Sequence, residues 1–123
     1  MRRILDHVVT EADRGIEIAV VDAPGAGGAH HRYEILVPGD QTRAPTIYEL
    51  QFQNGPAVEQ GVNGLTQEAL IAICIDRLRC FQSGPFSCRE NALALTHLQD
   101  AMHWLQHRTR DRMSRGVEGR AEK

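Results

Sequence analysis

The stretch LRCFQSGPFSCRENALAL, residues 78 to 95, holds side chains that could bind a small nucleotide. Phe81 offers a ring on which a purine can stack, and the amide of Asn91 can donate to and accept from a base edge or a ribose hydroxyl. If two helices meet at this joint, the ring and the amide lie near each other. Backbone N–H groups at the start of the second helix would then favour a phosphate. The alternative is that Phe81 and Phe86 only plug the end of a helical hairpin.

Other chemistries fit the residues less well. His103 and His107 are four apart, but HWLQH has tryptophan where an HExxH protease needs glutamate, and no third zinc ligand is placed. GAGG at residues 25–28 is not followed by Lys-Ser or Lys-Thr, so it predicts a flexible loop and not a phosphate loop. No nucleophile and base occur in a motif with known mechanics. The residues therefore favour a binding protein without catalytic residues, metal or cofactor.

Arginine dominates the basic residues. Thirteen of the fourteen are arginine, and the single lysine is the last residue. Genomic base composition is one explanation, and planar bidentate contact with phosphates, carboxylates or base edges is the other. Arg108 and Arg112 fall at the end of a predicted long helix. That end either faces solvent or packs on another copy of the protein, where facing arginines would need an anion between them.

Bulk properties predict a soluble intracellular protein. The 123 residues fit a single domain, 1–123, and the net charge of -2 gives no basic field for nucleic acid polymers or anionic membranes. No apolar run approaches the roughly 20 residues of a membrane helix. Cys74, Cys80 and Cys88 are odd in number and form no CxxC pair, which favours reduced thiols in the cytosol.

Residues 1–56 are expected to form mainly β-strands. Short segments at 16–20, 32–37 and 46–52 are rich in β-branched and aromatic residues and are bounded by Gly, Pro and Asp. The third alternates between apolar and polar residues, which is typical of a half-buried strand in an antiparallel sheet. Residues 1–14 fit either a short helix or an edge strand.

Residues 62–116 change to a helical period. Thr66 is a candidate N-cap, and apolar residues then recur at helical spacing on more than one side. Ser87 and Glu90 spell a capping box for a second helix from Cys88 to Arg115, closed by Gly116 and on the order of 42 Å long. Its inward stripe is traced as Asn91, Leu95, Leu98, Met102, Leu105, Arg108 and Arg112. The prediction is an α+β fold: a small antiparallel sheet, a two-helix antiparallel hairpin and a flexible tail, residues 117–123.

Four segments resemble the Thoeris anti-defence proteins of the first type: IYELQFQNG, GVNGLTQEALIAICIDRL, FQSGPFSCRENALAL and RTRDRMSRGVEG. The resemblance covers about residues 30 to 119. These phage and prophage proteins share their helical hairpin with the second anti-CBASS protein. The resemblance implies a non-enzymatic sponge in the host bacterial cytoplasm, which binds cyclic nucleotide immune messengers and keeps them from activating effectors.

The resemblance also implies ligands and site residues. Phe81 and Asn91 match the pair that holds glycocyclic ADP-ribose, the messenger of Thoeris. Arg108 and Arg112 match arginines of a second site, for the cyclic trinucleotides of CBASS, which forms where dimers assemble into a hexamer. Cyclic dinucleotides are further CBASS ligands of the family. Additional candidates for the first site are Arg32, Arg43 and Arg77.

Two other functions stay open on the residues. One is an enzyme that cleaves the same messengers. The other is a protein-interaction module whose long helix binds a partner helix and which takes no small ligand.

Overall fold

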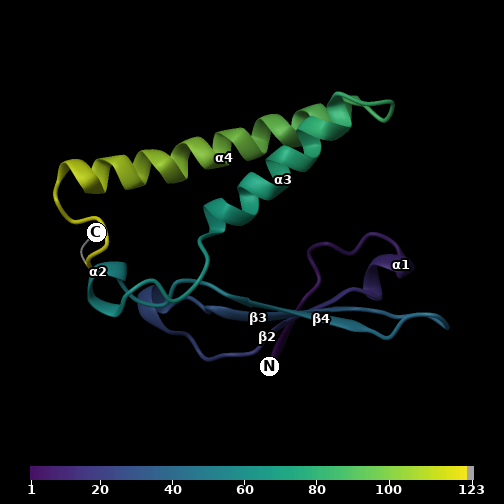
Figure 1. Ribbon diagram of the computed structural model, residues 1–123, viewed down its shortest axis with the longest axis horizontal. Helices are drawn as coiled ribbons and strands as arrows, with labels where there is room; N and C mark the ends of the chain where they lie inside the picture. The colour runs from purple at the N-terminus through teal and green to yellow at the C-terminus, as the bar shows by residue number, and fades with distance from the viewer. Residues whose placement is uncertain (122–123) are drawn as a thin grey trace. The chain divides into compact units, whose positions relative to one another are not determined.

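The computed structural model describes residues 1–121, which fall into two compact units (Figure 1). The first unit comprises Met1–Leu65 and the second begins at Thr66. The first contains a β-sheet and the second a helical hairpin, so the predicted α+β fold is confirmed. Among the described residues, no helix is long and apolar enough to cross a membrane.

The sheet has four antiparallel strands in sequential order. They are β1 (Arg2–Ile4), β2 (Glu17–Val20), β3 (Arg32–Val37) and β4 (Thr46–Gln51). Ala19 and Val20 of β2 are its buried residues. Three strands lie within two residues of their predicted positions.

The amino-terminal residues contain both structures that the sequence left open. β1 pairs with β2, and the short helix α1 (Glu11–Arg14) follows it. The Asp13 carboxylate accepts hydrogen bonds from the backbone N–H groups of Val9 and Thr10, at 3.0 and 2.8 Å. These bonds, above all the one from Thr10, hold the pKa of Asp13 below its ordinary value.

Strand β4 is less buried in the single chain than its alternating pattern predicts. Leu50 is half-buried and Phe52 packs edge-to-face on Tyr33, with 5.6 Å between ring centroids. Tyr48, however, shares the face of Leu50 and Phe52 and is 55% exposed, whereas the exposure of Ile47, 59%, agrees with its place on the opposite face.

Side-chain amides organise the segment after β4, which contains the short helix α2 (Ala57–Gln60). Asn54 and Asn63 are joined by two hydrogen bonds of 2.8 Å. The Asn63 side-chain oxygen accepts from the Asn54 N–H, and the Asn63 side-chain nitrogen donates to the Asn54 carbonyl. The Gln53 amide donates to the Gly61 carbonyl at 2.7 Å and accepts from the Asn63 backbone at 2.9 Å. At Gly64 a side chain would collide with the backbone of Phe52, so only glycine fits there.

The hairpin unit consists of α3 (Gln67–Gln82) and α4 (Arg89–Ser114), which pack against each other (Figure 1). The Thr66 hydroxyl caps α3 as predicted, accepting from the Ala69 N–H at 3.2 Å. One face of α3 is covered, with Ile75 buried. The wider burial that the sequence predicts is not seen in the single chain, where Ile73 is 64% exposed and Cys74 and Cys80 are exposed.

The ends of α4 agree with the prediction to within a residue, but its cap differs. The N-cap is Cys88 and not Ser87, and the Cys88 Sγ accepts from the Asn91 N–H at 3.4 Å. At the other end Gly116 has a φ of 73°, and the Val117 N–H reaches back to the Arg112 carbonyl at 3.0 Å. This is the Schellman ending, which favours glycine because the backbone turns left-handed there.

Candidate functional site

The tip of the hairpin brings a cation and an aromatic ring together. Arg77 and Phe81 are one helical turn apart on α3, and the Arg77 guanidinium carbon lies 5.0 Å from the Phe81 ring centroid. The ring is half-buried and the guanidinium is exposed. This is a cation–π contact. The guanidinium lies over the ring, so a base that stacks on this face would take its place.

Two hydrogen bonds hold the connection between Phe81 and Asn91. The Cys88 N–H donates to the Gln82 side-chain oxygen at 3.1 Å, and the Asn91 N–H donates to the Cys88 sulfur at 3.4 Å. Asn91 is therefore fixed in the first turn of α4, while Phe81 is in the last turn of α3. The hairpin places both at its tip, as the sequence predicts.

This arrangement suits a purine nucleotide or a molecule built from one. A base can stack on an aromatic face, an amide reads a base edge or hydroxyl, and a guanidinium binds a phosphate bidentately. The described residues contain no group of three or more His, Cys, Asp or Glu side chains that could hold a metal ion.

Arg108 and Arg112 lie toward the other end of α4 and differ in environment. After the first turn of α4, its buried and half-buried residues follow one another at spacings of alternately three and four residues. This stripe passes through Thr109, and Arg108 lies beside it and is exposed. The predicted stripe was wrong at Arg108. Arg112 does belong to the stripe and is 5% exposed.

The residues after Gly116 surround Arg112. Its Nε donates to the Glu118 carboxylate at 3.1 Å, and its Nη2 donates to the carbonyls of Val117 and Arg120, both at 2.8 Å. The guanidinium thus fastens residues 117–120 to the end of α4. Residues 122 and 123 of the predicted flexible tail lie outside the described residues.

The remaining candidates belong to the sheet unit. Arg32 is exposed at the start of β3. Arg43 is exposed in the loop before β4, where its guanidinium lies 3.7 Å from the Asp40 carboxylate. That carboxylate accepts from the hydroxyl and N–H of Thr42 and from the Arg43 N–H, and these bonds lower the pKa of Asp40.

A carboxylate also fastens the glycine-rich loop between β2 and β3. Asp22 accepts from the His31 N–H at 2.9 Å, which is the largest cause of its lowered pKa. His31 is 8% exposed, and its ring nitrogen lies 3.0 Å from the Ala26 carbonyl. The loop is therefore held at both ends, unlike the free loop that GAGG suggested.

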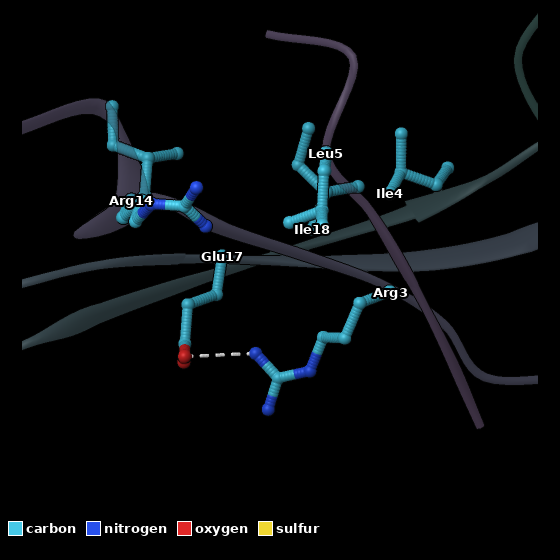
Figure 2. Close-up of a pocket in the computed structure, with 7 residues that line it drawn as sticks. Arg3, Ile4, Leu5, Arg14, Glu17 and Ile18 are labelled. Carbon is cyan, nitrogen blue, oxygen red and sulfur yellow. Dashed lines mark ion pairs between the residues drawn. The ribbon is translucent and has the colours of Figure 1, made fainter. Parts of the chain in front are cut away.

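A cavity of about 360 Å³ opens beside β1 and β2 (Figure 2). Aliphatic side chains form much of its wall, together with Arg14 and the Arg3–Glu17 ion pair, whose atoms are 2.9 Å apart. The predicted ligand-binding residues do not line it.

Sequence reasoning missed Gln82, Cys88 and Glu118. Gln82 looks like an ordinary residue at a helix end, and cysteine is an uncommon cap because sulfur accepts hydrogen bonds weakly. Glu118 follows the Gly116 stop signal, which could have indicated a chain that folds back on the helix.

Comparison with known proteins places this hairpin in a family. The family model described as "Acb2/Tad1, hairpin domain" matches residues 48–110, about half of the chain. A curated protein from Bacillus phage SBSphiJ7, "Thoeris anti-defense 1", is 53% identical over 80 residues, which are 65% of this chain and 56% of that protein. The chain thus matches little more than half the length of this relative. By the extent of the family match, the chain belongs to the Acb2/Tad1 hairpin-domain family, as its sequence predicted.

Proposed function

We propose that this protein counters bacterial anti-phage defence by binding and sequestering cyclic nucleotide messengers. The observation that carries the proposal is the hairpin tip, where Arg77 contacts the Phe81 ring in α3 and the Asn91 backbone is bonded to Cys88 at the start of α4, within a hairpin of this family. The relative's printed name, "Thoeris anti-defense 1", supports the same role.

Glycocyclic ADP-ribose is the proposed ligand of the hairpin tip. Its adenine would stack on Phe81, its hydroxyls or base edge would meet the Asn91 amide, and Arg77 would contact a phosphate. Arg32 is the proposed contact from the sheet unit. Sequestration needs tight binding, and nanomolar affinity corresponds to about 12 kcal/mol. Stacking on one ring can provide on the order of 1–3 kcal/mol of this, so charged hydrogen bonds must provide much of the rest.

Cyclic trinucleotides are the proposed ligands of a second site around Arg108 and Arg112. Arg108 is exposed and can reach a phosphate directly. Arg112 is already paired with Glu118, so it would contribute mainly by holding the end of α4 in place. Cyclic dinucleotides remain further candidate ligands.

The exposed surface supports an oligomer. The chain exposes 9177 Å². A compact monomer of its mass would expose roughly 6,600 Å², and two separate compact units of half that mass roughly 8,000 Å² together. On the hairpin, the large exposed apolar side chains include Ile73, Phe86 and Trp104. We propose a homo-oligomer, either a dimer or a hexamer made of three dimers.

The proposed action is binding without turnover, in the cytoplasm of the infected bacterium. The test is to incubate the protein with glycocyclic ADP-ribose or with a cyclic trinucleotide and remove free ligand by filtration. The protein is then denatured by heat, and the released material is chromatographed. A sponge retains its ligand and releases it intact.

Two results would contradict the proposal. Release of a cleaved product would identify an enzyme acting on the messenger. Retention of neither ligand would favour a protein-interaction module, which the exposed apolar residues of the hairpin also fit.

A further inference from the structure

Trp104 is an exposed aromatic side chain on α4 to which no ligand contact has been assigned. It is 66% exposed, and it is the single tryptophan of the chain. It lies outside the half-buried stripe that faces α3. The outer face of a helix normally carries polar residues, and exposing an indole to water there costs free energy.

Two histidine rings support the indole. His103 and His107 contact Trp104 edge-to-face, with ring centroids 5.3 and 5.8 Å away and interplanar angles of 73° and 83°. Both histidines lie on the same side of Trp104 around the helix, where their own rings stack with 6.3 Å between centroids. This packing restricts the rotation of the indole, so little freedom is lost when a planar ligand stacks on its exposed side.

Side chains of opposite charge lie one helical turn from Trp104 on either side, so the surface is electrostatically asymmetric. Arg108 is one turn toward the carboxyl end of α4 and Asp100 is one turn toward the amino end, and both are exposed. A phosphate is attracted by Arg108 and repelled by Asp100. A nucleotide whose phosphate contacts Arg108 would therefore carry its base back over Trp104.

We infer that Trp104 is a stacking platform for a nucleobase of the ligand whose phosphate contacts Arg108. The inference rests on the proposed second site and adds the residue that binds its base. The ligand class is a purine nucleotide with a negatively charged linkage, and the probe is cyclic triadenylate.

The intrinsic fluorescence of the protein tests this directly. Because Trp104 is the single tryptophan, its emission reports on this position alone. Excitation at the red edge of indole absorption, where adenine absorbs little, should show quenching as cyclic triadenylate is added. The quenching should saturate at the ligand concentration at which binding saturates in equilibrium dialysis.

Variants measure the contribution to affinity. Trp104→Leu should weaken binding of cyclic triadenylate by roughly tenfold, and Trp104→Phe should weaken it less because a phenyl ring still stacks. Gln99→Ala is the control, since Gln99 is an exposed polar residue of the same helix. Equal oligomer size of all variants in sedimentation shows that an altered assembly is not the cause.

The outcomes separate this inference from the proposed function. Binding in dialysis without quenching, and with unchanged affinity of Trp104→Leu, overturns the stacking role and leaves the second site standing. No binding of cyclic triadenylate overturns both. Emission that changes on dilution of the protein but not on addition of ligand assigns Trp104 to a contact with a second copy of the chain.

Discussion

The side-chain oxygen of Gln82, at the end of α3, accepts a hydrogen bond from the backbone nitrogen of Cys88, at the start of α4, with 3.1 Å between the atoms. Cys88 in turn caps the Asn91 N–H. The two helices are thus tied across their connection by one glutamine side chain.

Gln82→Ala should loosen this connection. Loss of one hydrogen bond should lower the free energy of unfolding by about 0.5–1.5 kcal/mol and weaken glycocyclic ADP-ribose binding, because Asn91 is then less well positioned. Thermal denaturation and calorimetric titration measure the two effects. Gln99→Ala, at an exposed position of α4, is the control. Unchanged affinity at reduced stability would make Gln82 purely structural.

Phe81→Ala and Asn91→Ala should each weaken glycocyclic ADP-ribose binding and leave the protein folded. Removal of the ring should cost on the order of 1–3 kcal/mol of binding free energy through lost stacking. Phe86→Ala is the control, because Phe86 is 74% exposed in the same connection. If calorimetry gives wild-type affinity for both variants, the hairpin tip is not the binding site.

Arg108→Ala and Arg112→Ala should separate binding from stability. Arg108→Ala should abolish cyclic trinucleotide binding with an unchanged melting temperature, because Arg108 is exposed. Arg112→Ala leaves the Glu118 carboxylate and two carbonyls without their donor, so it should destabilise the protein by about 1–3 kcal/mol. The double variant, Arg108→Ala with Arg112→Ala, should still bind glycocyclic ADP-ribose. Loss of both ligands would indicate one shared site or a disrupted oligomer.

Acid should weaken the sheet unit. Asp13, Asp22 and Asp40 have a pKa below their ordinary value, so each contributes stability above about pH 4 that is lost as the pH falls through its lower folded-state pKa. Urea unfolding at a series of pH values between about 2 and 7 measures the loss of stability, because this range spans the titration of the carboxylates. Asp22→Asn should be less stable at neutral pH and should lose less on acidification. Equal slopes for both proteins would contradict the assignment.

The periodicity of the sequence predicted α3, α4 and three strands because each has a continuous apolar pattern, whereas the four-residue helices α1 and α2 are too short to show one. Gly116 and Thr66 marked helix ends correctly since both act through the local backbone. The sequence predicted Ser87 as the N-cap of α4 because serine caps more often than cysteine. Two contacts distinguish Cys88, its sulfur accepting from the Asn91 N–H and its backbone N–H donating to Gln82, and no spacing rule indicates the second.

The candidate site was predictable where it depends on one helix turn and not where the chain folds back. Arg77 and Phe81 meet because they are four residues apart. Arg112 is buried by residues after the helix, which a helical stripe does not include. The exposure of Tyr48 likewise cannot be predicted from an alternating pattern, which marks an apolar face but not what covers it.

The paired amides after β4 also bear on how the protein ages. Asn54 and Asn63 both precede glycine, and asparagine before glycine deamidates readily because the following backbone nitrogen can attack its side-chain carbon. The oxygen and the nitrogen of the Asn63 amide are both hydrogen-bonded to the Asn54 backbone. Both hydrogen bonds must break before this side chain can close the succinimide ring through which asparagine deamidates. The same contacts that shape the turn should therefore slow deamidation at Asn63.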